Sequence, residues 1–214
     1  AELLLLVADA LDLVVRIRDE EEELGSGIEP DPIETPYSRT SVRLLFKRRV
    51  SWLLGLMLLA LVSATVVSLF RDTLTAAVAL AFFIPVVTGT GGNTGTQSAT
   101  LIIRALGTED VSPADWLRVF VKELFVGAVL GAALAATIAL IGLAWPPGRG
   151  VAHIVGATMV ALVLWANLVG ALLPIFLRRV GVDPAIAGAP LVSTVVDATG
   201  LIIYLGVAKL WLGH

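Results

Sequence analysis

Residues 190–200 read Pro190-Leu-Val-Ser-Thr-Val-Val-Asp197-Ala-Thr-Gly200 and place one carboxylate inside an otherwise uncharged run. Asp197 lies 13 residues after Pro184 and 12 before Lys209, so a membrane-spanning helix between these residues would hold it near the middle of the bilayer. An ionisable side chain at that depth costs about 2.5–3.5 kcal/mol on insertion scales and usually faces a cavity or an ion path. We therefore interpret Asp197 as a functional residue. The alternative is an acid that is protonated or hydrogen-bonded to a neighbouring helix.

The composition indicates a protein that crosses the membrane several times. Of its 214 residues, 57% are hydrophobic, and the mean hydropathy is +0.91. These values are too apolar for a soluble domain of this length. The chain contains no cysteine, which excludes disulfides and thiolate metal sites. We expect a multi-pass protein of the cell (inner) membrane.

The first 42 residues differ in character from the rest of the chain. Residues 1–24 carry apolar side chains at helical spacing and predict an amphipathic helix on the cytoplasmic side. The acidic run at residues 19–23 is either a solvated helix end or a regulatory cation site. Residues 25–42 are rich in Pro, Gly and acidic residues, which predicts a linker. Residues 43–214 form the predicted membrane domain.

The apolar runs of this domain predict an all-α protein with five transmembrane helices. The runs cover residues 50–70, 73–103, 112–145, 152–177 and 184–212. As a helix, the second would be about 46 Å long, which exceeds a bilayer core of about 30 Å, so it must tilt, protrude or break. Ser112 and Asp115 are spaced to cap the start of the third run, and Asp183 and Pro184 to open the fifth.

The positive charges predict how these helices are oriented. The ends on the side of the first span's start are flanked by Arg43, Lys47, Arg48, Arg49, Arg104, Arg118, Lys122, Arg178 and Arg179. The opposite ends are flanked by Arg71, Arg149 and Lys209. By the positive-inside rule, the first group is cytoplasmic. We therefore expect a cytoplasmic N-terminus and a C-terminus outside.

The second run contains a glycine-rich segment, Pro85-Val-Val-Thr-Gly89-Thr-Gly91-Gly92-Asn93-Thr-Gly95-Thr-Gln97-Ser98. Its glycines and proline weaken a helix, and irregular backbone at membrane depth is found only inside protein or along a wet cavity. Its hydroxyls, amides and carbonyls are hard oxygen donors of the kind that suits Mg²⁺ or Ca²⁺. Asn93 and Gln97 share one helix face. The alternative is a packing motif of Gly91 and Gly95, with Asn93 holding a neighbouring helix.

Two further patterns concern packing and symmetry. Gly127, Gly131 and Ala135 form a stripe of small residues that permits close helix approach. Residues 85–95 and 190–200 share a Pro and a Thr-Gly pair at the same offset. An odd number of predicted crossings separates these two segments, so they run in opposite directions through the membrane. Paired irregular segments of opposite direction are typical of substrate sites in transporters.

The glycine-rich segment, continued by Ile103-Arg104-Ala105-Leu106, closely resembles the second-span signature of the MgtE magnesium channel and transporter family. The fourth and fifth spans of that family are similar to Asn167-Leu-Val-Gly170, Gly181-Val-Asp183-Pro184 and Asp197-Ala-Thr-Gly200. The resemblance covers residues 50–214. It implies a homodimer of five-helix protomers whose second and fifth helices line a pore on the twofold axis. It also implies that Asp197 is the pore aspartate for hydrated Mg²⁺ and that Asn93 belongs to the pore helix.

The sequence departs from the family pattern at two points. Ala189 stands where family members commonly carry Asn, which puts one contact near the ion in doubt. The N-terminal helical domain and the pair of CBS domains that typically sense Mg²⁺ in the family have no counterpart in these residues. Residues 1–24 resemble the connecting plug helix of the family.

Together these observations predict a site for a hydrated ion. Mg²⁺ sheds water reluctantly, so we expect it to sit hydrated between two Asp197 side chains, one from each protomer. Ser193 and Thr194 would assist with hydroxyls and backbone carbonyls, and Asn93 and Gln97 with amides. The predicted function is conduction of Mg²⁺ and other divalent cations. Mg²⁺ bound at residues 19–23 would regulate it.

Other functions remain open at this point. In a proton-coupled divalent cation exchanger, Asp197 itself would titrate. An intramembrane aspartyl protease needs two carboxylates that share a proton, and Asp197 is the only acid that the charge pattern places at span depth. A membrane scaffold without transport would leave the cost of a buried acid unexplained. We therefore expect a transporter and not an enzyme.

Overall fold

The computed structural model describes residues 40–144 and 149–213. All elements in these residues are helical. They are α2 (Val42–Leu69), α3 (Arg71–Ala76), α4 (Ala79–Gly107), α5 (Trp116–Ala144), α6 (Ala152–Arg179) and α7 (Ala189–Leu212), with the short 3₁₀ helices η2 (Pro113–Asp115) and η4 (Pro184–Ala187). The predicted helix over residues 1–24, with its acidic run, and the linker as far as residue 39 lie outside the described residues.

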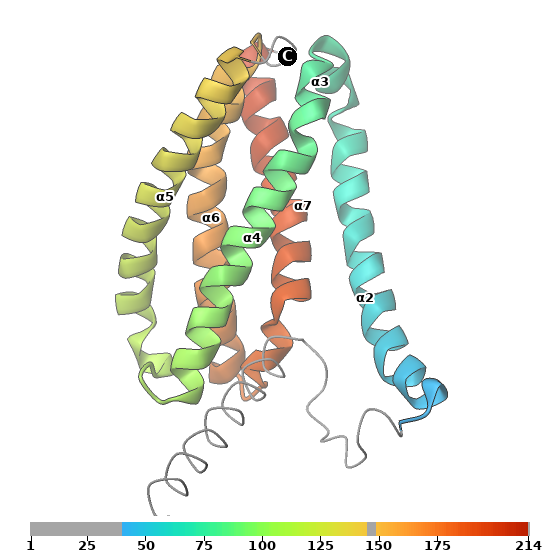
Figure 1. Cartoon of the computed structure of the whole chain (residues 1–214), viewed down its shortest axis with the longest axis vertical. Helices are drawn as coiled ribbons and strands as arrows, with labels where there is room; N and C mark the ends of the chain where they lie inside the picture. The colour runs from blue at the N-terminus through green and yellow to red at the C-terminus, as the bar shows by residue number, and fades with distance from the viewer. Residues whose placement is uncertain (1–39, 145–148, 214) are drawn as a thin grey trace, which may run out of the picture.

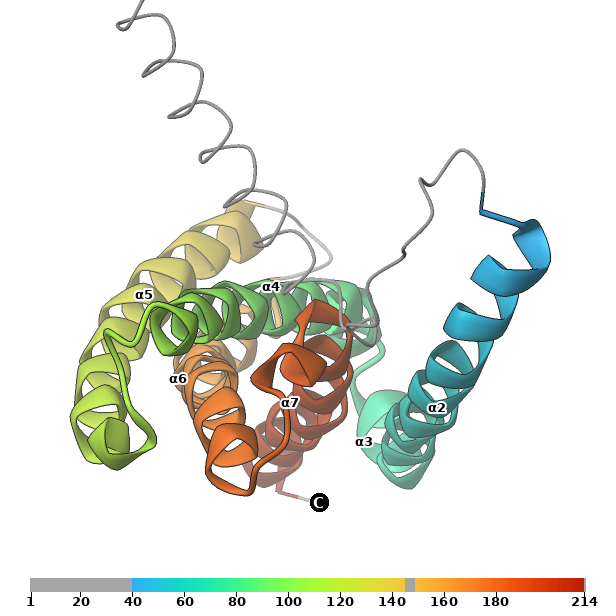
Figure 2. The ribbon, with the colours of Figure 1, turned by 90° about the horizontal axis from the view of Figure 1, so that it is seen from below.

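The long helices run alternately up and down (Figure 1). We call the end where α7 finishes the upper end, and the end where α2 begins the lower end. α4 crosses the bundle obliquely and packs against α6 and α7, while α5 packs against α6. α2 contacts α7 and diverges from the bundle toward the lower end (Figures 1 and 2).

Four helical segments are long and apolar enough to cross a membrane by length and composition. They are α2, Pro113–Gly142 (η2 and most of α5), α6 and α7. α4 is as long as α5, with 29 residues, but its glycines, threonines and amides make it less apolar and leave it outside this group. The expected count of five spans therefore depends on α4.

The second predicted run is divided into two helices. α3 ends at Ala76, and the backbone of Ala77 leaves the helical region with φ −142° and ψ 78° before α4 begins. α4 is also tilted relative to its neighbours (Figure 1). Both a break and a tilt thus accommodate the excess length that the sequence predicts.

Two predictions about the backbone were wrong. Asp183 and Pro184 cap and open a helix as expected, since Asp183 Oδ1 accepts a hydrogen bond from Ala185 N (2.9 Å), but that helix is the short η4, and α7 does not begin there. Gly188, with ψ 171°, separates η4 from α7. The expectation of irregular backbone also fails, since α4 and α7 are continuous through residues 85–98 and 190–200. The contacts of the glycines, described below, explain why these segments remain helical.

The predicted cap of the third run is present. The backbone N–H of Ser112 donates to Asp115 Oδ2 at 2.9 Å, and the Ser112 hydroxyl donates to the same oxygen at 2.5 Å. Pro113 occupies the first helical position of η2, which leads into α5. This motif was predictable because all of its contacts lie within four consecutive residues.

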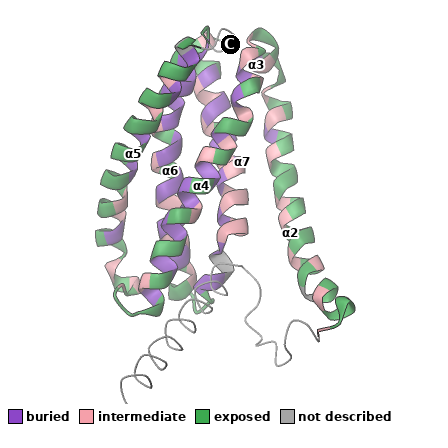
Figure 3. Ribbon diagram, in the orientation of Figure 1, coloured by how far each residue is buried: buried purple, intermediate pink, exposed green. Residues whose placement is uncertain are grey.

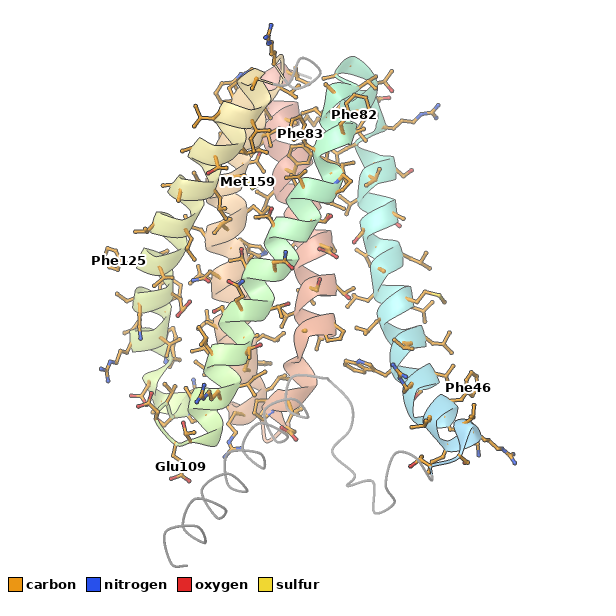
Figure 4. All side chains as sticks on the ribbon, viewed as in Figure 1. Phe46, Phe82, Phe83, Glu109, Phe125 and Met159 are labelled. Atoms are coloured by element: carbon orange, nitrogen blue, oxygen red, sulfur yellow. The ribbon has the colours of Figure 1, made fainter. Side chains whose placement is uncertain are left out.

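The core lies between α4, α6 and α7 (Figure 3). Its upper part is apolar and includes Phe83 of α4 and Met159 of α6 (Figure 4). Tyr204 of α7 is fully buried there, and its hydroxyl donates to the carbonyl oxygen of Leu80 at 2.9 Å. By contrast, much of the surface of α2 and α5 is exposed and apolar, as at Phe125, which points away from the bundle (Figures 3 and 4).

Candidate functional site

The glycines of α4 allow it to lie in close contact with α6 and α7. A methyl group added to Gly170 of α6 would stand 2.1 Å from the carbonyl oxygen of Gly95, so these helices cross with backbone against backbone. A methyl group at Gly91 would stand 2.9 Å from Val196 of α7. Such contacts offset the roughly 1 kcal/mol that an interior glycine costs a helix. The packing role of Gly91 and Gly95 is therefore confirmed.

Two glycines of α5 permit a similar approach to α6. A methyl group at Gly127 would stand 3.2 Å from the Cα atom of Leu164, and one at Gly131 would stand 3.1 Å from the Cα atom of Val160. The predicted stripe of small residues is thus a close helix contact. α4 and α5 are both held against α6 by glycines.

Asp197 lies on α7 beside Gly92 of α4. A methyl group at Gly92 would stand 3.6 Å from Asp197 Oδ1 and 2.6 Å from Ser193 Oγ, so two predicted site residues face the same part of α4. Asp197 Oδ1 is shielded from solvent, and within the described part of the chain it has no hydrogen-bond partner. Burying a carboxylate oxygen is costly unless a donor or a cation compensates it. This oxygen is therefore a candidate cation ligand.

The other predicted site residues are placed differently. Asn93 and Gln97 are both exposed on α4 in the single chain, so Asn93 does not hold a neighbouring helix as the packing alternative supposed. Thr194 donates its hydroxyl to the carbonyl of Pro190 in its own helix, at 2.7 Å. The structure thus brings Asp197 together with one predicted partner, Ser193. The amides lie on an open face of α4, and the Thr194 hydroxyl is engaged within α7.

Glu123 of α5 is an acidic residue within a candidate span that the sequence analysis missed. Its Oε2 atom accepts hydrogen bonds from Asn167 Nδ2 of α6 at 2.6 Å and from Ser98 Oγ of α4 at 3.1 Å. The sequence analysis counted Asp197 as the only acid at span depth, and the contacts of Glu123 add a second acid inside a candidate span. Glu123 follows Lys122 and resembles a polar flank, but its four-residue spacing from Gly127 could have placed it on the packed face of α5.

The donors near Asp197 suit an ion that keeps its water. Among the described residues, no group of three or more His, Asp or Glu side chains is placed to hold a metal ion directly. Asp197 and Ser193 offer a carboxylate and a hydroxyl, which are hard oxygen ligands. Because Mg²⁺ retains several waters and binds proteins through one or two carboxylates, this chemistry fits a hydrated divalent ion.

Comparison with known proteins agrees with this chemistry. Residues 84–207 match the model of the MgtE family, described as divalent cation transporter. The chain is 47% identical to the magnesium transporter MgtE of Thermus thermophilus over 208 residues, which cover 96% of this chain and 45% of that protein. It is 34% identical to the magnesium transporter MgtE of Bacillus subtilis over 202 residues, covering 94% and 44%.

A third relative is the magnesium transporter MgtE of Enterococcus faecalis, with 32% identity over 167 residues, or 78% of this chain and 37% of that protein. The chain thus spans less than half the length of the curated relatives it matches. The family match includes most of α4 and most of α7, which carry all the predicted site residues. The apolar helices, the oxygen donors beside Asp197 and this match show that the chain is a membrane protein of the MgtE family of divalent cation transporters.

Proposed function

We propose that this chain forms a homodimeric pore through which hydrated Mg²⁺ crosses the membrane, with α4 and α7 of both protomers lining the path. The observation that carries the proposal is the unpartnered Oδ1 atom of Asp197 beside Gly92 and Ser193. α4 serves as the fifth span, and the lower end, where Arg43, Arg104 and Arg178 lie on α2, α4 and α6, is cytoplasmic.

Electrostatics favours a divalent ion at Asp197. A carboxylate that acts through bound water lies roughly 4 Å from Mg²⁺, because water ligands sit at about 2.0–2.1 Å. At that distance and an effective dielectric of about 20, each carboxylate attracts a divalent ion by about 8 kcal/mol gross and a monovalent ion by about 4 kcal/mol. Desolvation offsets much of this attraction. Retaining the water shell keeps binding weak enough for the ion to leave.

The exposed amides of α4 support a second copy as the partner of this face. Asn93 and Gln97 are exposed in the single chain, although polar side chains within a membrane usually face the protein interior or water. A twofold axis beside α4 would bring the amides and the Asp197 residues of two copies around one wet path. Symmetry also supplies the second carboxylate that one chain lacks at this site.

Substitution of Asp197 tests the ion path. In proteoliposomes, Asp197→Asn should lower Mg²⁺ uptake at least about tenfold, because removing a few kcal/mol of net attraction exceeds the 1.4 kcal/mol that corresponds to a factor of ten. Asp72→Asn is the matched control, since Asp72 is exposed on α3 and should transport normally. Native flux and selectivity in Asp197→Asn would refute the proposal.

Two further measurements test the dimer and the mode of transport. Because the chain has no cysteine, Asn93→Cys should form a covalent dimer on mild oxidation. Phe125→Cys, on the outward face of α5, should not. A pH gradient without a Mg²⁺ gradient should drive no Mg²⁺ uptake through a pore, whereas uptake under these conditions would favour proton-coupled exchange.

A further inference from the structure

Glu123 of α5 connects three helices of the bundle. Its Oε2 atom accepts hydrogen bonds from Ser98 of α4 and Asn167 of α6. Asn167 Nδ2 also donates to the backbone carbonyl of Glu123 at 2.9 Å. Ser98 and Asn167 are each only 3% exposed. Glu123 itself is half-buried, so this cluster is a partly buried polar connection in a region where most side chains are apolar.

The position of the cluster follows from the glycine contact between α5 and α6. A methyl group at Gly127, one turn beyond Glu123, would stand 3.3 Å from the Cβ atom of Asn167. Because glycine leaves this space open, Asn167 reaches both the carbonyl and the carboxyl group of Glu123. Asn167 therefore holds the Glu123 carboxyl group against α6, in the position where it also accepts the hydrogen bond from Ser98.

The hydrogen bond from Ser98 to Glu123 restricts the rotation of α4 about its own axis. Gly95, at the crossing with Gly170, lies about 160° around the helix from Gln97, so at this one point α4 meets α6 backbone against backbone. Away from the crossing, buried apolar side chains of α4 such as Ile102 and Ile103 make contacts that have no preferred direction. The bond to Glu123 lies about 100° from Gln97 and supplies a directional contact.

We propose that Glu123 is a positioning residue for ion conduction: held by Asn167, its carboxyl oxygen fixes the rotation of α4 through Ser98 and so directs Asn93 and Gln97 into the ion path. The role rests on the proposed pore and adds a residue that does not touch the ion. It requires a hydrogen-bond acceptor at position 123 and does not require a charge.

The orientation of α4 can be measured without transport. Single cysteines replace Asn93 at the front of α4, Thr96 and Leu101 on its two flanks, and Ala99, which is only 1% exposed. Each is introduced into the native protein and into variants with Glu123→Ala, Glu123→Gln or Ser98→Ala. The modification rate by a membrane-impermeant methanethiosulfonate is measured in proteoliposomes. Thr137→Ala, which removes a hydroxyl bonded only within α5, is the control background.

With native Glu123, Asn93→Cys should react faster than both flank positions. Glu123→Ala and Ser98→Ala should each change the ratio of front to flank rates by about tenfold, as expected from the loss of a buried hydrogen bond to a carboxyl group. Glu123→Gln should keep the native ratio, because its amide oxygen can accept both bonds. Ser98→Ala keeps the test informative if Glu123→Ala does not fold.

Three results would overturn the proposal. The first is a native ratio of front to flank rates in both Ser98→Ala and Glu123→Ala. The second is a Glu123→Gln variant with the same ratio as Glu123→Ala, and the third is fast modification of Ala99→Cys in the Glu123→Ala and Ser98→Ala variants, which would indicate that the whole bundle has loosened. Failure of the proposed pore would appear differently. In that case, modification of Asn93→Cys would leave Mg²⁺ flux unchanged in the protein with native Glu123.

Discussion

Gly170→Ala tests the backbone contact between α4 and α6. The new methyl group would lie far inside contact distance of the Gly95 carbonyl oxygen, so the two helices must move apart. Overpacking costs about 1–3 kcal/mol, and we take the upper value because the atom that blocks the methyl group is backbone and cannot rotate away. Alanine regains up to about 1 kcal/mol of helix propensity. The expected net loss of stability is therefore about 2 kcal/mol.

Equilibrium unfolding in mixed micelles of a mild detergent and sodium dodecyl sulfate, followed by the fluorescence of the five tryptophans, measures this loss. A change of 2 kcal/mol lowers the ratio of folded to unfolded protein roughly thirtyfold. The matched control is Gly206→Ala of α7, where a methyl group meets nothing within 4 Å; it should be neutral or stabilise by up to about 1 kcal/mol. Equal stability of the two variants would refute the close crossing.

Three further predictions address single contacts. Gly92→Ala should fold, because the Ser193 side chain can rotate away from the new methyl group, yet Mg²⁺ uptake should fall, because the methyl group crowds Ser193 and Asp197; native uptake would contradict the shared space beside Asp197. Tyr204→Phe should lower the free energy of unfolding by about 1 kcal/mol through loss of the bond to Leu80, and an unchanged unfolding midpoint would count against it. Removing the η2 cap with Asp115→Ala should lower the free energy of unfolding in the same assay, without a change in ion selectivity.

The sequence predicts most clearly those features that depend on neighbouring residues. The uncharged runs locate the long helices because burying apolar surface in a membrane needs about 20 apolar residues in succession. The cap at Ser112 and Asp115 is likewise local. The stripe at Gly127 and Gly131 predicts a close contact, but not that α6 is the partner. Partners are set by the tertiary arrangement.

The errors arise where packing outweighs local preference. Gly91 and Gly95 indicate a weak helix by propensity, yet contacts with α6 and α7 keep α4 continuous. Glu123 was missed because charged residues precede it, and only its contacts with Ser98 and Asn167 reveal that it joins α5 to α4 and α6. Asp197 was predicted as a site residue from its isolation in an apolar run, and its role stays a prediction. That Gly92 lies beside Asp197 could not be predicted from the sequence, because a glycine has no side chain whose chemistry would indicate a contact.

The crossing of α4 and α6 at Gly95 constrains how α4 can move. With backbone against backbone, α4 cannot approach α6 at this point, so the contact acts as a fulcrum. The arms of this lever extend about 18 Å to Gly107 and about 24 Å to Ala79. A shift of 1 Å at the lower end therefore swings the upper end by about 1.3 Å in the opposite direction. A displacement of α4 on one side of the membrane would thus produce a slightly larger displacement of α4 on the other side.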